Sequence, residues 1–165
     1  MKKNNFLAGF SLIEILVVIG IIGILGALAF TAFGGVRGKA RDAKRLNDLN
    51  QIGRFLNFGC VMPETGPGEY DLNELLAEYK SKYPQYNNII PKDISDPKSG
   101  TELVSNYKYI IESDNKCVLY ANLEDANREV TLTAISAPTP GGGKGVFVSP
   151  NKGWNGSDKF FQVSN

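Results

Sequence analysis

The sequence predicts an α+β protein in which a long N-terminal α-helix, apolar over its first half, packs on a small antiparallel β-sheet head. Three observations lead to this prediction. No charged side chain occurs from Ile15 to Phe33. An amphipathic helical pattern follows and continues to Leu56. Beyond Tyr107, short runs of β-branched and aromatic residues alternate with tight turns, a spacing typical of antiparallel hairpins.

The first helix is predicted from the apolar run Phe10–Phe33, whose only ionisable side chain is Glu14. At ~1.5 Å per residue such a helix is about 36 Å long, enough to cross a hydrocarbon core of ~30 Å. The run is apolar on every side of the helix. This pattern favours burial in a membrane or in a bundle of helices.

A cleaved secretory signal peptide is the alternative interpretation of this run. Lys2 and Lys3 would form its basic region, and Ala27-Leu28-Ala29 resembles a cleavage site. However, the uncharged run continues to Phe33. The Glu14 carboxylate also lies at its start, where it costs on the order of 2–3 kcal/mol if it enters the bilayer. Both observations favour an uncleaved apolar helix.

Glu14 requires a partner, because an unpaired carboxylate in an apolar environment is costly. No basic side chain lies within two helical turns of it in the sequence. The partner must therefore be a chain terminus or a group from another subunit.

The helix is expected to continue to about Phe58, beyond the Gly34-Gly35 pair. Apolar residues at three- and four-residue steps predict the face that packs on the sheet: Val36, Ala40, Ala43, Leu46, Leu49, Ile52 and Leu56. The opposite face carries the charged residues Arg37, Arg41, Lys44, Arg45 and Asp48. A solvated face explains these charges better than a DNA-binding patch, because no aromatic residues alternate with them. DNA binding stays open as the less favoured interpretation.

The head is expected to contain one short helix between two loops. Asn57–Tyr70 is rich in Gly and Pro and predicts a loop. Asp71 is a candidate N-cap for a helix that ends near Tyr83, before Pro84. Ile90–Gly100 predicts a second loop.

The strands are expected after these elements. Three runs are predicted to form the sheet: Tyr107–Glu112, Lys116–Leu123 and Glu129–Ile135. Gly145–Ser149 is a candidate short strand, and the polar tail beyond Pro150 is predicted to be a loop.

Composition argues against an enzyme or a metal protein. The 165 residues include 18 Lys and Arg, 17 Asp and Glu, and no histidine, which removes the commonest acid–base group and transition-metal ligand. No nucleophile motif such as GxSxG is present. Asp93, Asp96, Asp114 and Asp158 lack EF-hand spacing, and turn formation or capping explains them without calcium. No cofactor or metal is therefore expected.

Two cysteines remain, Cys60 and Cys117. In an exported domain two isolated cysteines favour one disulfide. The alternative is two buried free thiols that pack as small apolar groups.

The N-terminal residues resemble a known signal. Gly9-Phe10-Ser11-Leu12-Ile13-Glu14 follows a short basic leader and precedes an apolar run. This pattern resembles the class III signal of type IV pilins and type II secretion pseudopilins. The resemblance implies that prepilin peptidase cleaves between Gly9 and Phe10 and that the new N-terminus, Phe10, is N-methylated.

The resemblance also implies an organisation in four parts. Residues 1–9 form the leader peptide, 10–33 the transmembrane and filament-core helix, 34–58 its amphipathic continuation, and 59–165 the globular pilin head. The N-terminal amine of Phe10 in one subunit is expected to pair with Glu14 of its neighbour during assembly.

By this resemblance the chain is a structural subunit of a type IV pilus-like filament, a homo-oligomer on the cell surface. Its expected partners are prepilin peptidase, inner-membrane assembly platform proteins and minor pilins. The precursor is expected to cross the cytoplasmic membrane once with its head exported, before it enters an extracellular or periplasmic filament. Counting basic residues on each side of the helix favours the opposite orientation, and the cleavage signal is the reason to prefer an exported head.

Two alternatives stay open. A type II secretion major pseudopilin shares the N-terminal signal and differs mainly in the head. A membrane-tethered binding module that does not polymerise would have no use for Glu14, so this residue favours an assembling subunit.

Overall fold

The computed structural model describes residues 11–56, 59–88, 90, 94–98 and 107–165. The side chains of residues 29–34, 55 and 56 lie outside this description. The chain divides into two compact units, an N-terminal unit Met1–Arg37 and a head unit Gly38–Asn165. Helix α1 (Leu12–Leu56) begins in the first unit and ends in the second.

The described residues of the head unit form two further helices and five strands. In chain order after α1 these are β1 (Gly68–Asp71), α2 (Leu72–Lys82), the 3-10 helix η1 (Pro84–Tyr86), β2 (Lys108–Ile111), β3 (Cys117–Asn122), β4 (Gly145–Val148) and β5 (Lys159–Ser164). The described chain is therefore α+β.

The N-terminal unit consists, within the described residues, of the first part of α1. Large apolar side chains from Leu12 to Leu28 are exposed on this part of the helix. A helix both long and apolar enough to cross a bilayer is not found among the described residues.

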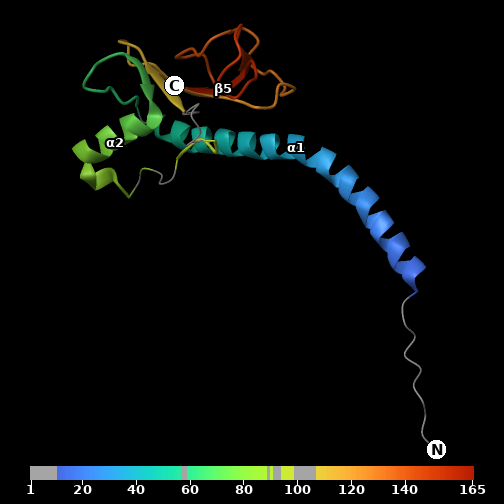
Figure 1. The fold of residues 1–165 in the computed structure, drawn as a ribbon. Helices are drawn as coiled ribbons and strands as arrows, with labels where there is room; N and C mark the ends of the chain where they lie inside the picture. The colour runs from blue at the N-terminus through green and yellow to red at the C-terminus, as the bar shows by residue number, and fades with distance from the viewer. Residues whose placement is uncertain (1–10, 57–58, 89, 91–93, 99–106) are drawn as a thin grey trace, which may run out of the picture. The chain divides into compact units, whose positions relative to one another are not determined.

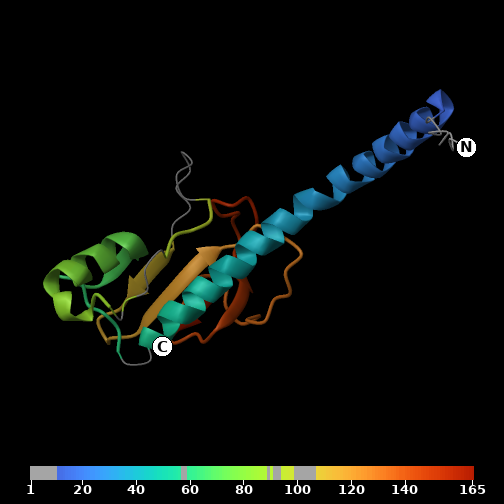
Figure 2. The ribbon, with the colours of Figure 1, turned by 90° about the horizontal axis from the view of Figure 1, so that it is seen from below.

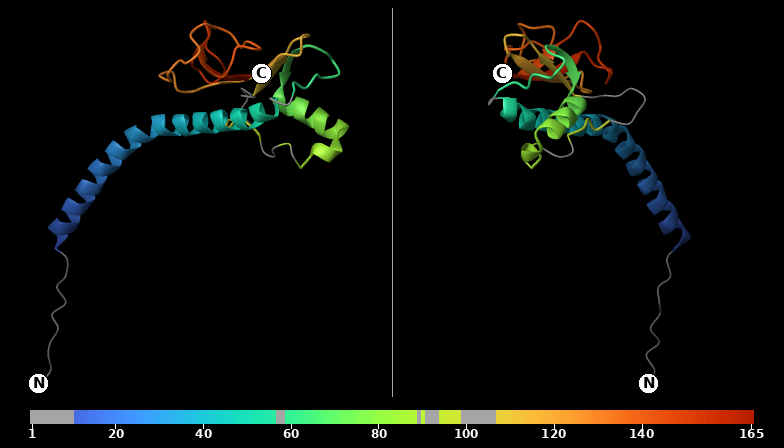
Figure 3. Two further views of the ribbon diagram at one scale, coloured as in Figure 1. Left: turned by 180° about the vertical axis from the view of Figure 1, so that it is seen from behind. Right: turned by 90° about the vertical axis from the view of Figure 1, so that its left-hand side faces the viewer.

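The five strands form one sheet in the order β1-β2-β3-β5-β4, with every neighbouring pair antiparallel. Tyr109 of β2 lies opposite Leu119 of β3, and Ala121 of β3 lies opposite Phe161 of β5. The second part of α1 runs along one face of this sheet (Figures 1 and 2). Helix α2 lies at the β1 end of the sheet (Figure 3).

The face of the sheet toward the helices carries the main core. Alternate strand residues point to this face, as the two-residue period of a strand requires. Leu49 and Ile52 of α1 and Leu72 and Leu75 of α2 join a buried cluster. Its strand members are Tyr109, Ile111, Cys117, Leu119, Ala121, Val146, Phe161 and Val163.

The opposite face of the sheet carries a smaller cluster built on Tyr120, Phe147 and Phe160. Leu132 and Trp154, which lie outside the strands, pack against it. Both faces of the sheet are therefore covered, which explains why all six residues of the central strand β3 are buried.

Several sequence-based predictions are confirmed. Helix α2 begins after Asp71, whose carboxylate accepts a hydrogen bond from the Asn73 amide at 2.9 Å. Strands β2 and β3 lie within the two runs predicted for them and form a hairpin. Strand β4 lies within the predicted run Gly145–Ser149.

Three predictions for the head were wrong. The run Glu129–Ile135 is not a strand, although the amides of Thr131 and Leu132 both donate to the Val146 carbonyl and cover the outer edge of β4. The tail predicted to be a loop contains β5, which pairs with both β3 and β4. The predicted loop Asn57–Tyr70 contains most of β1. Strand β1 is short and lies at the edge of the sheet. Such a strand forms mainly because it pairs with its neighbour, so its own residues give only a weak sequence pattern.

The predicted buried face of α1 was correct only at its C-terminal end. Leu49 and Ile52 are buried, whereas Val36, Ala40 and Ala43 are exposed. Three successive three-residue steps lead from Ala43 to Ile52, and each step falls about 60° short of a full turn. The assumed stripe therefore winds around the helix instead of following one face.

The charged face of α1 was predicted to be solvated. Arg37 and Lys44 are exposed as predicted, but the prediction was wrong for Arg45 and Asp48. Asp42, Arg45 and Asp48 are buried, and Arg41 is half-buried. These residues lie on or beside the face that carries Leu49 and Ile52. The helix therefore meets the head through a polar section followed by an apolar one.

Candidate functional site

The N-terminal unit presents an extended apolar surface. We call it the α1 apolar surface, and it consists of the exposed side chains Leu12, Ile13, Ile15, Leu16, Val17, Val18, Ile19, Ile21, Ile22, Ile24, Leu25 and Leu28. Five of these are consecutive, from Ile15 to Ile19. Because neighbouring helical residues are about 100° apart, they point to all sides of the helix. Such a surface indicates an interaction site for a partner or a membrane.

Glu14 lies within this surface, in the first turn of α1. Its amide donates to the Ser11 carbonyl at 3.0 Å, and the residue is exposed. A carboxylate near a helix N-terminus interacts favourably with the helix dipole. Gly9 and Phe10, the predicted cleavage and methylation residues, lie outside the described residues.

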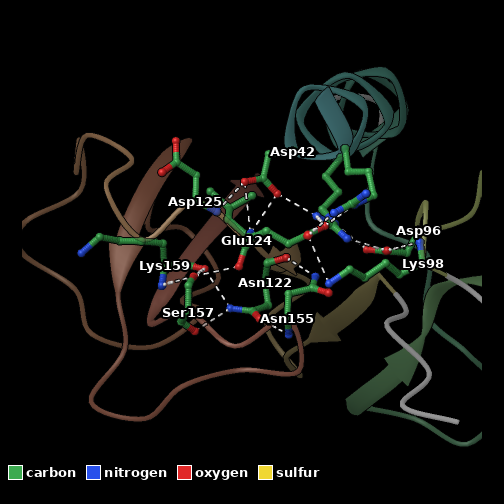
Figure 4. Close-up of polar contacts among 12 residues, drawn as sticks. Asp42, Asp96, Lys98, Asn122, Glu124, Asp125, Asn155, Ser157 and Lys159 are labelled. Carbon is green, nitrogen blue, oxygen red and sulfur yellow. Dashed lines mark hydrogen bonds and ion pairs between the residues drawn. The ribbon is translucent and has the colours of Figure 1, made fainter. Parts of the chain in front are cut away.

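A set of charged side chains connects α1 to the rest of the head unit, and we call it the helix–head ion cluster (Figure 4). Four cations and four anions form it: Arg41, Lys44, Arg45, Lys98, Asp42, Asp48, Asp96 and Glu124. Five of the eight come from α1. The others come from later segments: Asp96 is 51 positions from Arg45 and Glu124 is 79 positions from it, so the cluster connects distant parts of the chain.

Arg45 is at the centre of the cluster, with a fully buried side chain. Its Nε and Nη2 donate to the two carboxylate oxygens of Asp96 at 2.7 and 2.8 Å. Its Nη1 donates to Asp42 and Glu124, both at 2.7 Å. Burial alone would lower the pKa of Arg45, but the hydrogen bonds to Asp96, Glu124 and Asp42 outweigh this effect and raise the pKa above its usual value. The guanidinium therefore remains charged.

Asp42 attaches the loop after β3 to the helix. Its carboxylate accepts hydrogen bonds from the backbone amides of Glu124 and Asp125, at distances from 2.9 to 3.1 Å. It also pairs with Arg45, so both of its oxygens are satisfied although the side chain is fully buried. This arrangement fixes the loop against one turn of α1.

Glu124 receives three cations. Arg41 donates to both of its oxygens at 2.7 and 2.6 Å, and Lys98 lies 3.1 Å away. Burial alone would raise the pKa of Glu124, but the hydrogen bonds from Arg41, Arg45 and Lys98 lower it to about 2. Glu124 is therefore ionised across the physiological pH range.

Asp48 extends the cluster toward β2. The buried Tyr107 hydroxyl donates to Asp48 at 2.8 Å, and Lys44 donates to the same carboxylate at 2.6 Å. Lys44 also donates to the Ser95 carbonyl at 2.9 Å. Burial, followed by the hydrogen bond to Asp48, raises the pKa of Tyr107, so the phenol stays protonated and acts as a donor.

A neighbouring network of uncharged side chains holds the loop before β5 (Figure 4). Asn122 is fully buried and donates to the carbonyls of Ser157 and Lys159 at 3.0 and 2.9 Å. Asn155 donates to the Asn122 carbonyl at 2.8 Å, and the Ser157 hydroxyl donates to Leu123 at 2.7 Å. This network places Trp154 against the outer face of the sheet.

The two cysteines are joined: Cys60 and Cys117 form a disulfide between positions 57 residues apart. It links the segment after α1 to the first residue of β3. Of the two alternatives that the sequence left open, the structure contains the disulfide.

Three of the aspartates considered for calcium each lie beside a different basic side chain. Asp96 pairs with Arg45, Asp114 lies 2.6 Å from Lys116, and Asp158 lies 3.5 Å from Lys159. Asp93 lies outside the described residues. Within the residues that the structure describes, no group of three or more carboxylate or cysteine ligands converges on a metal position.

The sequence predicted Glu14 and the cysteines as candidate residues but missed the ion cluster. The sequence did contain a signal for it. Asp42, Arg45, Leu49 and Ile52 follow one another at steps of three or four residues, the spacing of one helix face. A search for apolar residues alone ignores such positions.

No family model, no curated protein and no solved structure matches this chain.

Proposed function

We propose that this chain is the structural subunit of a type IV pilus-like filament, processed by prepilin peptidase and assembled through its N-terminal helix. The observation that carries the proposal is Glu14 within the α1 apolar surface, in the sequence Gly9-Phe10-Ser11-Leu12-Ile13-Glu14. A helix that exposes apolar side chains on all sides needs cover. Copies of the same helix, packed side by side, provide such cover.

Glu14 receives a role in this arrangement. In a bundle of apolar helices a carboxylate is costly unless a cation neutralises it. The N-methylated amine of Phe10 from a neighbouring copy supplies that cation. The pair then fixes the register between copies, while apolar packing provides most of the cohesion.

The head is compatible with export. Cys60 and Cys117 form a disulfide, and disulfides persist mainly in oxidising compartments outside the cytoplasm. The proposal therefore includes a precursor held in the cytoplasmic membrane with its head exported, followed by an extracellular or periplasmic filament. Prepilin peptidase, the assembly platform and minor pilins are the proposed partners.

The first test is the native N-terminus. Expression with a prepilin peptidase should yield a mature chain that starts at N-methylated Phe10, as measured by intact-mass and peptide mass spectrometry. Retention of Met1, or a start at Phe30, would contradict the proposal.

The second test is Glu14→Gln in the full chain. We expect processing at Gly9 to continue and sheared fibres to disappear, because the neutral amide leaves the incoming amine without its counterion. Electron microscopy with antibodies against the head measures the fibres. Glu74→Gln is the matched control, since Glu74 lies in the first turn of α2 and is exposed. This control should leave fibres unchanged.

The outcomes distinguish the alternatives. Normal fibres with Glu14→Gln would remove the pairing role. A processed wild-type chain that never enters fibres would favour a membrane-tethered binding module instead. Fibres that form only together with a secretion system would favour the pseudopilin.

A further inference from the structure

A pocket of about 590 Å³ opens in the head unit between α2, the segment after α1 and the sheet. Its floor is aliphatic, with Ile52 from α1, Leu72 and Leu75 from α2, and Leu119 from β3. All four belong to the main core. The volume lies within the range of ~300–1,000 Å³ that is typical of small-molecule sites.

The mouth of this pocket gathers the exposed apolar side chains of the head. Met62 is 43% exposed and Tyr86 is 42% exposed, and both line the pocket. Among the described residues of the head unit they are the only large apolar side chains with such exposure. Exposed apolar groups around a concave site indicate binding rather than chance.

One wall of the pocket is held from two directions. Cys60 is fixed to β3 by the disulfide. The next residue, Val61, donates its amide to the Tyr109 hydroxyl at 2.9 Å, and that hydroxyl donates back to the Val61 carbonyl at 3.0 Å. These contacts fix the segment that carries Met62, so this wall is formed in advance.

Another part of the lining is a group of three tyrosines, Tyr79, Tyr83 and Tyr86. The rings of Tyr79 and Tyr83 are 4.8 Å apart between centroids, and those of Tyr79 and Tyr86 are 6.3 Å apart and stacked. Backbone hydrogen bonds connect the same residues, from Tyr83 to Tyr79 and from Tyr86 to Tyr83. This part of the lining therefore offers aromatic surface together with phenol hydroxyls.

The charges at the pocket balance. Glu78 and Lys82 line it, one of each sign. Lys82 is already paired with Glu64 at 2.8 Å, and the Glu64 amide donates to Glu78 at 3.3 Å. A charged ligand that approached the group of opposite charge would also be repelled by the neighbouring group of like charge. An uncharged ligand does not experience this repulsion.

We propose that this pocket binds a small uncharged amphiphile, with its apolar body on the aliphatic floor and its hydrogen-bonding head among the tyrosine hydroxyls. The floor has no polar group for a buried polar body, which excludes a sugar or nucleotide from the interior. The hydroxyls of the lining tyrosines can donate to or accept from an alcohol or amide. This inference is independent of filament formation.

The test uses a photoreactive probe because the α1 apolar surface also attracts apolar compounds. The full chain in lipid nanodiscs is irradiated with a long-chain alcohol that carries a diazirine on its alkyl chain. Mass spectrometry then locates the labelled residues. We expect labels in the segments 59–62 and 72–86, suppressed by excess unlabelled alcohol, and weaker labels there with the carboxylate and trimethylammonium probes of equal chain length.

Two variants with matched controls identify the site. Leu76→Trp fills the pocket, and Ala77→Trp adds the same ring at an exposed neighbouring position that does not line it. We expect labelling of the pocket segments to fall about tenfold in the first and to stay unchanged in the second. Met62→Glu, a change at an exposed position, should reduce labelling without affecting folding, with Ala77→Glu as its control.

Each result decides for or against the proposal. Labelling of the pocket segments that persists in folded Leu76→Trp and Met62→Glu chains would overturn it. So would stronger labelling by either charged probe. Cross-links from the mouth to a second copy of the chain, unaffected by excess alcohol, would assign the pocket to a contact between copies instead.

Discussion

At the scale of single residues, Arg45 connects three segments of the head unit. A buried guanidinium is costly unless it is paired, and Arg45 meets carboxylates from its own helix, from the 94–98 segment and from the loop after β3. A shift of α1 by one residue would leave these charges unpaired. The cluster therefore selects one register of α1 on the head, which apolar packing alone does more weakly.

Glu124 gives this cluster a measurable pH dependence. Its pKa is about 2 in the folded chain, compared with an ordinary value of 4.5. Because the folded pKa is the lower one, its stabilising contribution is complete above about pH 4.5 and is lost as the pH falls toward 2. The full contribution is on the order of 3 kcal/mol.

The measurement compares wild type with Glu124→Gln by urea unfolding, followed through Trp154, the only tryptophan. We expect a large stability difference at pH 7 that shrinks between pH 4.5 and pH 2. Asp114→Asn, at an exposed hairpin position, should show little difference at any pH. A Glu124 difference that does not vary with pH would exclude the ionised carboxylate as its source.

At the scale of secondary structure elements, α1 and β5 approach each other closely at Gly53. A Cβ at Gly53 would overlap Val163 Cγ1 and lie 3.2 Å from the Val163 Cβ. Glycine weakens a helix by ~1 kcal/mol relative to alanine. Its presence here is explained by the space that a side chain would need.

Gly53→Ala is therefore expected to destabilise the head by about 1–3 kcal/mol, because overpacking outweighs the gain in helix propensity. Gly38→Ala is the matched control on the same helix, where a Cβ would make only ordinary contact with Glu124 at 3.7 Å. The control should be neutral or stabilising by up to ~1 kcal/mol. Urea unfolding of both variants measures the contrast, and equal effects would contradict the close packing.

At the scale of the whole molecule, the disulfide connects the segment that follows α1 to the central strand β3. Strand β3 is the most buried strand of the sheet, and Cys117 begins it. The bond closes a loop that contains β1, α2 and β2. It also holds the wall of the proposed amphiphile pocket.

Removal of this bond is expected to destabilise the head substantially. In the chain-entropy description a closed loop of 57 positions contributes about 4 kcal/mol, because the bond restricts the unfolded chain. The Cys60→Ala and Cys117→Ala double variant should therefore unfold at lower urea concentration. Reducing agent should lower the stability of the wild type to that of the variant and leave the variant unchanged.

The sequence by itself determined the local elements. The uncharged run predicted the start of α1, Asp71 predicted the N-cap of α2, and the runs Tyr107–Glu112 and Lys116–Leu123 predicted the β2–β3 hairpin. These features depend on residues within a few positions of one another, so their patterns are visible without a fold. The position of Glu14 near the start of the apolar run was visible in the sequence for the same reason.

Only the tertiary structure decided which side chains are buried together. Arg45 pairs with Asp96 across 51 positions and with Glu124 across 79 positions. Such pairs have no local spacing, and their burial is favourable only when every partner arrives together. The same holds for β5, which is a strand because β3 and β4 lie on either side of it.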